Sequence, residues 1–309
     1  MAISADIYNA NQKFLWGLCY RMTGNAADAD EIVQETFVKA LESPPPRLDE
    51  PLRPWLVRVA INLSRDLLRM RKRRGYVGEW LPAPVPTENF EDPPSYDPPA
   101  SAEDLPSARY EMLESISFAF LLALEALTPT ARAVLLLRDV FDYSTNETAE
   151  ALGITESSAK VILHRARKAM SDYEKQHARK KTNLTKMTKN ALERFLFYFS
   201  NRDIEGLEQL LTEDVISVSD GGGEVYAAIK PIYGRRNVLR LIFGLAKKIA
   251  ATQQISFTTL NGLPAVVVEN IHNLQKIATR FTLHCQVDET GRIQKLDIVL
   301  APGKLTAVH

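Results

Sequence analysis

Basic side chains recur at helical spacing in two segments of the sequence, and charges of this kind bind phosphate. On one face of the first segment, polar and basic residues recur at i, i+4, i+7, i+11 and i+14: Arg58, Asn62, Arg65, Arg69 and Lys72. This segment ends in the basic run 69–74, and the second segment has its cations at 160–168 and 175–181. Charges at this density are not buried in a core. The two segments therefore predict a protein that holds DNA at two places by neutralising phosphates.

The second segment also offers side chains that could read bases. Its outward positions recur at i, i+3, i+4, i+7 and i+11: Ser157, Lys160, Val161, His164 and Lys168. Polar side chains on the exposed face of a helix are what distinguish base edges in the major groove. A single basic stripe would be better explained as a solvated helix face, but the presence of two favours DNA.

Acidic side chains share one helix face near the start of the chain, where they would repel DNA. The residues of this face are Asp30, Glu31, Gln34 and Glu35. They fit either a solvated surface or a surface for a basic protein partner. The residues alone leave both interpretations open.

Two helices are expected to position these acidic and basic groups. The first follows Asn25, with Asp28 at the spacing of a capping box. Its expected inner stripe is Val33, Phe37, Ala40 and Leu41. The second is expected over 53–74, with an inner stripe of Trp55, Val59, Leu63, Leu67 and Met70.

The later basic segment belongs to a predicted helix-turn-helix. Thr128 and Pro129 suit the N-cap and first position of one helix. A short helix is expected over 145–152, Gly153 supplies the turn, and Thr155 caps a helix of about four turns. The inner side of that last helix is predicted to be Ala159, Leu163, Ala166 and Met170.

Between the two helical regions lies a proline-rich linker. Residues 76–110 contain eight of the 17 prolines, seven acidic residues and one basic residue, so an extended conformation is expected. Trp80 and Leu81 are an apolar pair in this polar stretch, and we expect them to dock against another part of the protein.

From about residue 190 the pattern changes to that of a separate α+β domain. Helices are expected over 191–200, 204–211 and 236–249. Residues 277–287 alternate apolar and polar side chains with a period of two, which predicts a half-buried strand. A curved antiparallel sheet is expected here, with His284 in the polar phase of its strand.

Composition sets the limits on these interpretations. The 309 residues carry 38 basic and 38 acidic side chains, and 45% are hydrophobic, as in ordinary globular proteins. No apolar run is long enough to span a bilayer, and the first residues do not form a signal peptide. Two cysteines, Cys19 and Cys285, fit a reducing cytoplasm and form no metal cluster. We therefore expect a cytoplasmic protein with no membrane partner, no metal and no cofactor.

Three motifs together resemble a known family. DADEIVQETFVKAL at 28–41, RPWLVRVAINLSRDLLR at 53–69, and the stretch from LTPTARAVLLLRDVFDYS to LHRARKAM at 127–170 are similar to domains 2 and 4 of extracytoplasmic-function (ECF) sigma factors. These are the promoter-recognition subunits of bacterial RNA polymerase. The resemblance covers roughly residues 5–175, and it implies a sigma factor rather than an enzyme.

The resemblance assigns roles residue by residue. It implies that the β′ clamp helices of core RNA polymerase are bound by Asp30, Glu31, Gln34 and Glu35. It implies contacts to the −10 promoter element from Arg58, Asn62, Arg65, Arg69, Arg71 and Arg73. Contacts to the −35 element are implied for Ser157, Ser158, Lys160, His164, Arg165 and Lys168.

The remainder of the chain resembles the ECF subgroup with a fused SnoaL-like domain. The resemblance lies in GEWLPAP at 78–84, DGGG at 220–223, NGLPAVVV at 261–268 and APGKL at 301–305. In that subgroup the fused domain regulates the sigma factor in cis, in place of a separate anti-sigma factor. The implied regulatory contacts involve Trp80, Leu81, Pro82, Asp220, Gly221, Gly222, Gly223, Pro302, Lys304 and Leu305. Two motifs depart from the family, because Ala83 replaces a usual Glu and the Asn and Asp of the terminal NPDKL motif are Ala301 and Gly303.

We expect the linker to be held mainly by burial of Trp80 and Leu81, each worth about 1.5–3 kcal/mol when fully buried. Lys304 is expected to add a weak exposed ion pair with Glu79 or Glu88, worth about 0–1 kcal/mol. On this basis Trp80→Ala is expected to alter transcription more than Lys304→Ala.

The expected fold is multidomain. Two all-α sigma domains, the second a helix-turn-helix, are joined to each other by an extended linker. An α+β SnoaL-like cone follows them. The expected division is 1–75, 76–110, 111–178 and 186–309.

Two alternative functions remain open from the sequence. The SnoaL-like resemblance also includes cyclases and isomerases, so the chain could be a DNA-binding regulator fused to an enzyme domain. Catalytic candidates for such a domain are Asp214, Asp220, His272, His284 and Asp297. A simple helix-turn-helix repressor would explain 127–170 but neither the acidic face nor the first basic helix.

Overall fold

The computed structural model describes most of the chain, which forms two compact units. The residues described are 5–43, 52–87, 115–177, 184–246, 253–270 and 277–308. The first unit is Met1–Gly75 with Asn89–Ala178, and the second is Tyr76–Glu88 with Arg179–His309. The beginning of the expected linker therefore groups with the C-terminal domain. The catalytic candidate His272 lies outside the described residues.

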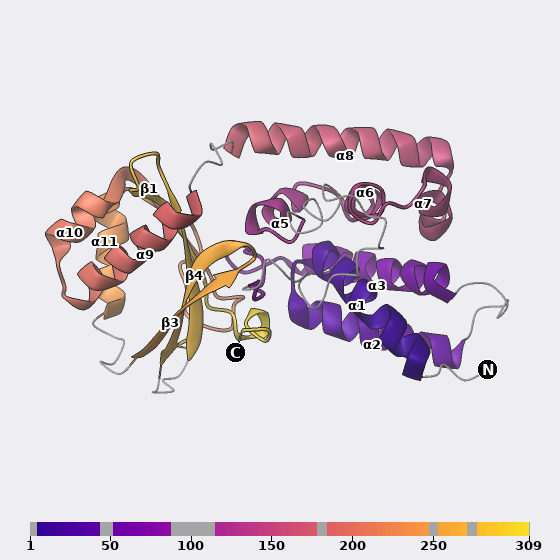
Figure 1. The fold of residues 1–309 in the computed structure, drawn as a ribbon, viewed down its shortest axis with the longest axis horizontal. Coiled ribbons are helices and arrows are strands. Elements are labelled where there is room, and N and C mark those ends of the chain that lie inside the picture. Colours follow the sequence, from indigo (N-terminus) through magenta and orange to yellow (C-terminus); the bar gives the residue numbers. More distant parts are fainter. Residues whose placement is uncertain are drawn as a thin grey trace. The chain divides into compact units, whose positions relative to one another are not determined.

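The first half of unit 1 is a three-helix bundle of α1 (Ala5–Thr23), α2 (Ala26–Glu42) and α3 (Leu52–Arg74) (Figure 1). The N-cap of α2 is Asn25, whose side chain accepts a hydrogen bond from the backbone N–H of Ala27. The buried face of α3 differs from the predicted stripe. It consists of Leu56, Val57, Ala60, Ile61, Ser64 and Leu68, because α3 contacts α1 and α2 and also α6 and α7.

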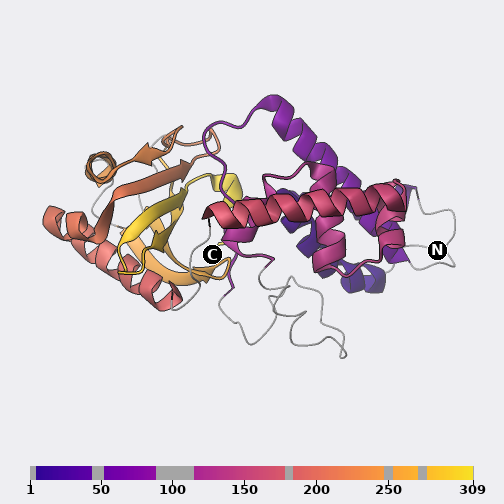
Figure 2. The same ribbon diagram turned by 90° about the horizontal axis from the view of Figure 1, so that it is seen from above.

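The second half of unit 1 contains the predicted helix-turn-helix. Its elements are α5 (Phe118–Leu124), α6 (Pro129–Leu135), a π-helical turn η1 (Leu136–Val140), α7 (Thr145–Leu152) and α8 (Glu156–His177). Ser144 and Glu147 form a reciprocal capping box at the start of α7, and Gly153 ends it at φ +65°. The prediction of this motif is confirmed, although α8 is longer than the expected four turns. Its full length is visible in Figure 2.

Two buried arginines join the two halves of unit 1. Arg21 of α1 donates from Nε to Ser115 Oγ at 2.7 Å. Arg132 of α6 donates from Nη1 to the carbonyl oxygen of Met22 at 2.7 Å. A guanidinium without partners is costly to bury, so these two bonds fix where the two halves meet.

Unit 2 is built on a six-stranded sheet in the order β2-β1-β6-β5-β4-β3. The strands are β1 (Leu211–Asp220), β2 (Ile232–Tyr233), β3 (Gln253–Leu260), β4 (Leu263–Asn270), β5 (Arg280–Val287) and β6 (Ile293–Val299). The expectation of a purely antiparallel sheet is wrong at one pair, because β1 and β6 are parallel. The α+β class itself is confirmed.

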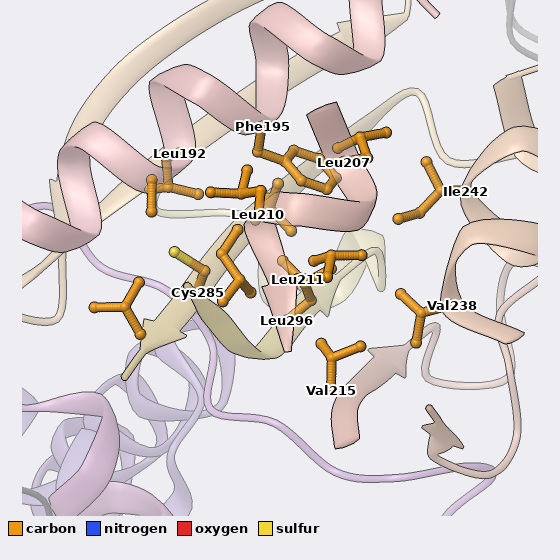
Figure 3. Packing of buried hydrophobic residues seen from close by; sticks show 14 of the residues in the cluster. Leu192, Phe195, Leu207, Leu210, Leu211, Val215, Val238, Ile242, Cys285 and Leu296 are labelled. Carbon is orange, nitrogen blue, oxygen red and sulfur yellow. The ribbon is translucent and has the colours of Figure 1, made fainter. Parts of the chain in front are cut away.

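Helices cover one side of this sheet and form the main core with it. They are α9 (Leu184–Ser200), α10 (Ile204–Leu210) and α11 (Arg235–Ala246). Figure 3 shows side chains such as Leu192, Phe195 and Leu207 meeting residues of the strands, including Cys285 and Leu296. The predicted alternation of β5 holds, since its odd-numbered residues face this core.

Two even-numbered residues in the middle of β5 are buried as well, which the sequence did not predict. His284 is 2% exposed and Thr282 is fully buried. The cause is a second layer on the opposite side of the sheet, formed by residues 81–87 and by the C-terminal segment, whose turn η2 (Pro302–Lys304) appears in yellow in Figure 1. Residues 81–87 reach as far as the β3–β4 turn, where the Val85 N–H donates to Asn261 Oδ1 at 3.1 Å.

Candidate functional sites

The carboxylate of Asp220 is the centre of a buried polar site in unit 2. Asp220 ends β1 and has no exposed surface. Its Oδ1 accepts from Tyr76 Oη at 2.6 Å and from the Gly222 N–H at 3.0 Å. Its Oδ2 accepts from the Leu81 N–H at 2.8 Å and from Lys304 Nζ at 2.6 Å. One side chain thus binds the start of the linker, its own turn and the C-terminal segment.

Lys304 completes this site from the other end of the chain. It lies in η2, is 4% exposed, and donates from Nζ to the Leu81 carbonyl oxygen at 2.6 Å. Its ammonium also lies 4.8 Å from the ring centroid of Tyr76 and 4.5 Å from that of Trp80, within the range of cation–π attraction. The expectation that Lys304 is exposed is therefore wrong, because its ammonium is buried and pairs with the buried Asp220. Glu88, one of the two partners expected for it, lies outside the described residues.

The glycine turn after β1 provides a close fit for both segments. Gly222 and Gly223 have φ of +61° and +78°, values that side chains rarely adopt. A Cβ on Gly222 would lie 3.1 Å from the Ala301 side chain, and one on Gly223 would lie 3.3 Å from that of Val77. We call residues 76–82, 220–223 and 301–305 together the clasp.

The structure brings the predicted regulatory residues together in the clasp. Leu81, Pro82 and Leu305 are buried, Trp80 is half-buried and Pro302 is exposed. Sequence reasoning missed Tyr76, which is only a single aromatic residue after a basic run. Ala83, where the resemblance led us to expect a Glu, is completely buried, so this chain places an apolar side chain within the second layer.

The four residues predicted to bind core polymerase lie exposed on α2. They are Asp30, Glu31, Gln34 and Glu35. The Trp16 indole N–H donates to Asp30 Oδ1 at 2.7 Å and holds that carboxylate in place. Leu41 is 59% exposed and Val38 is also exposed. The prediction that Leu41 is part of the inner stripe is wrong, and α2 instead presents apolar side chains beside its acidic face.

The basic residues predicted for the −10 element lie along α3 with different exposures. Arg65 and Arg71 are half-buried, and the exposed members are Arg58, Asn62, Arg69 and Arg73. Arg58 donates from Nη2 to the Glu150 carbonyl oxygen of α7 at 2.7 Å. Arg71 binds Asp28 and the carbonyl oxygen of Thr23, so its guanidinium is already engaged within the bundle.

The residues predicted for the −35 element are all exposed on α8. They are Ser157, Ser158, Lys160, His164, Arg165 and Lys168. The hydroxyl of Thr155 accepts from the Ser158 N–H at 3.2 Å and caps the helix as predicted. Arg167 is engaged elsewhere, because its Nε and Nη2 donate to the Asp139 carboxylate of η1 at 2.9 and 2.5 Å.

The catalytic candidates of the alternative interpretation do not share one environment. Asp214 is exposed, and Asp220 belongs to the clasp. His284 and Asp297 are cross-strand neighbours on β5 and β6, and both are buried. Burial lowers the pKa of His284 to about 4, and Asp297 pairs with Lys295 at 2.8 Å. In the described part of the chain, no cluster of His, Cys, Asp and Glu suits a metal ion. No described helix is long and apolar enough to cross a membrane.

Comparison with known proteins identifies the helical unit as that of a sigma factor. The model of sigma-70 region 2 matches residues 7–74, and that of sigma-70 region 4 matches 117–170. Among curated proteins, ECF RNA polymerase sigma factor SigJ of Mycobacterium tuberculosis H37Rv is 32% identical over 243 residues, covering 78% of this chain and 72% of SigJ. The chain therefore belongs to the ECF RNA polymerase sigma factors.

Two further comparisons bear on the extent of the likeness. ECF RNA polymerase sigma factor SigG of M. tuberculosis CDC 1551 is 32% identical over 211 residues, but the match spans only 56% of SigG. The crystal structure of M. tuberculosis SigJ aligns with 98% of both chains, with a TM-score of 0.65 and 26% identity. The likeness to SigJ thus includes the C-terminal α+β domain, and it confirms the multidomain fold expected from the sequence.

Proposed function

We propose that this sigma factor binds core RNA polymerase through the acidic face of α2 and that the contact is made with the clamp helices of β′. This proposal rests on the exposure of Asp30, Glu31, Gln34 and Glu35 beside the apolar Val38 and Leu41. A polar rim next to apolar side chains is the composition of a protein interface. Solvated helix faces do not need exposed Leu and Val at this position.

Charge reversal on α2 tests this assignment. Glu31→Lys with Glu35→Lys should weaken binding to purified core polymerase roughly tenfold or more, because like charges would then face a basic partner. The matched control is Asp6→Lys with Asp172→Lys, two exposed acids on α1 and α8. Both doubles should fold normally, since changes on an exposed face usually cost within about 0.5 kcal/mol each. Equal core affinity in the two doubles would contradict the proposal.

Promoter recognition is assigned to α3 for the −10 element and to α8 for the −35 element. The support is the exposure of basic residues along α3 and of polar and basic residues along α8. Arg71 is the exception in the α3 set, because it is held by Asp28 within the bundle. We expect it to orient α3 rather than to contact DNA.

The clasp is proposed to regulate the sigma factor in cis. The observation that carries this proposal is that one carboxylate, Asp220, binds the linker at Tyr76 and Leu81 and the C-terminal segment at Lys304. A closed clasp ties residues 76–87 to unit 2 and shortens the tether left between the two promoter-binding regions. Its opening would lengthen that tether, so the C-terminal domain takes the role of a separate anti-sigma factor.

A regulatory role for unit 2 is favoured over catalysis. His284 is held neutral between layers of the protein, and Asp297 is paired with Lys295. A general acid or base must reach its substrate, and burial on both sides of the sheet opposes this. The protein would act in the cytoplasm, where core polymerase and promoter DNA are.

A further inference from the structure

One stretch of unit 2 concentrates positive charge that the proposed function does not use. Residues 225–248 contain six basic residues and no acidic residue, whereas 191–309 as a whole hold 13 basic and 12 acidic residues. The described members are Lys230, Arg235, Arg236 and Arg240, which lie before and along α11. We call this group, with the exposed side chains of residues 226–233, the basic strip. The remainder of the domain is correspondingly acidic.

The basic strip has no counter-charge among the described residues. Lys230, Arg236 and Arg240 are exposed and Arg235 is half-buried, and no ion pair within the described ranges involves any of them. Arg235 and Arg236 also occupy the first turn of α11, which has no acidic residue. Cations at a helix N-terminus oppose the helix dipole. A local cost that no described residue offsets favours an external anionic partner.

Large side chains project from the same stretch. Tyr226, Ile229 and Tyr233 are 70%, 66% and 61% exposed. Exposed aromatic rings interleaved with cations are the features that bind single-stranded nucleic acid, since rings stack on bases while cations neutralise the backbone. Exposed Glu213 and Asp214 lie beside Gly234 and limit the strip on that side.

The structure also distinguishes among anionic partners. A helix that binds a lipid surface inserts its apolar face, but the apolar face of α11 is committed to the core through Val238, Leu239 and Ile242. Duplex DNA does not expose base faces for stacking by Tyr226 and Tyr233. We propose that the basic strip is a binding surface for single-stranded nucleic acid, DNA or RNA, separate from the promoter contacts of α3 and α8.

A matched pair of double variants in the full-length protein tests this proposal. The test variant is Arg236→Glu with Arg240→Glu on α11, and the control is Lys186→Glu with Lys189→Glu, two exposed lysines on α9. Both doubles change the net charge equally and leave the sigma domains intact. Binding to 12-nucleotide single-stranded DNA, the same sequence as RNA, the matching duplex and vesicles of anionic phospholipid is measured by fluorescence anisotropy or sedimentation across a salt series.

The α11 double should bind single strands roughly tenfold more weakly, with a salt slope smaller by about 1.4, the value for two lost phosphate contacts. The α9 double should match the parent. Tyr226→Ala and Tyr233→Ala should each weaken binding to single strands about fivefold, which corresponds to the low end of the stacking energy of one base. Replacement of either tyrosine by phenylalanine should leave binding as in the parent, because the ring is kept. The strand bound more tightly by the parent identifies DNA or RNA as the source.

Two outcomes would overturn the proposal. One is equal affinity of the α11 and α9 doubles for both single strands. The other is that the α11 double loses as much affinity for the duplex or for vesicles as it loses for single strands. That result would mean that the basic strip binds phosphate in general or lipid. Neither outcome depends on transcription, so the proposed sigma activity stands or falls separately.

Discussion

Single charged residues determine much of this structure because several of them are buried. Lys304 and Asp220 form an ion pair almost without solvent contact, and Arg21 and Arg132 are buried where the halves of unit 1 meet. Removing one member of a buried pair leaves the other uncompensated, which is far more costly than the loss of an exposed pair. The sequence-based expectation that Trp80 outweighs Lys304 assumed an exposed ammonium, and because Lys304 is buried we now predict the opposite order.

The first prediction concerns this pair. Lys304→Met should destabilise unit 2 by about 3 kcal/mol and expose the 76–87 segment to limited proteolysis. Adding Asp220→Asn should recover at least half of the stability, because no buried charge remains. Transcription yield should change more in Lys304→Met than in Trp80→Ala.

Lys295→Met is the control for this experiment. It also removes the lysine partner of a buried carboxylate, that of Asp297, but it does so outside the clasp. It should lower stability and leave linker cleavage as in the parent. If the linker of the Lys304→Met protein is cleaved no faster than that of the Lys295→Met protein, the clasp does not hold the linker.

The second prediction concerns His284, whose pKa is lowered by burial from 6.5 to about 4. A lowered folded-state pKa means that the fold favours neutral histidine. The stabilisation is complete above pH 6.5 and is lost as the pH falls toward 4, by roughly 3 kcal/mol in total. His284→Gln should lack this part of the pH dependence. Hydrogen exchange of β5 and β6 amides, compared between parent and variant at each pH, measures the difference. Parallel curves for the two proteins would show that His284 does not titrate in this way.

Among the helices and strands, features set by neighbouring residues could be predicted from the sequence. Burial caused by segments distant in the sequence could not. The bounds of α7, its glycine turn and the alternation of β5 follow from periodicity and capping, which depend on neighbouring residues. The burial of His284 depends on residues 81–87 and 301–308, which are distant in sequence, so the strand appeared half-exposed. The face of α3 was misassigned for a similar reason, because α6 and α7 pack against it in addition to α1 and α2. Most of the clasp residues were found by family resemblance, but Tyr76 and the buried state of Lys304 required the structure.

The third prediction belongs to α8. Lys160→Ala and His164→Ala should change the preferred −35 sequence, because both side chains are exposed on the face that we propose reads the bases. Lys175→Ala and Arg179→Ala should lower binding to all sequences and reduce the salt slope by about 1 each. Competition among a library of −35 variants measures both effects. If all four variants lose the same binding affinity for every sequence in the library, Lys160 and His164 do not read bases.

In the whole molecule, each unit of this sigma factor is held together in part by polar contacts between segments distant in the sequence. In unit 1, Arg58 of the −10 set is bonded to the Glu150 carbonyl oxygen of α7, and two buried arginines join the bundle to the helix-turn-helix. In unit 2, the clasp holds the beginning of the linker. These polar contacts lie among buried apolar side chains, such as Phe14 against Phe141 in unit 1 and Leu81 and Leu305 in the clasp, so breaking them would also expose apolar surface.

The claim that this protein is a sigma factor is tested most directly by run-off transcription with purified core polymerase and a genomic promoter library. Transcript ends are mapped by sequencing. The account predicts discrete start sites that appear only when both core and this protein are present, and that disappear with Glu31→Lys and Glu35→Lys. A core preparation that initiates with another sigma factor but gives no specific transcript with this protein would contradict the account.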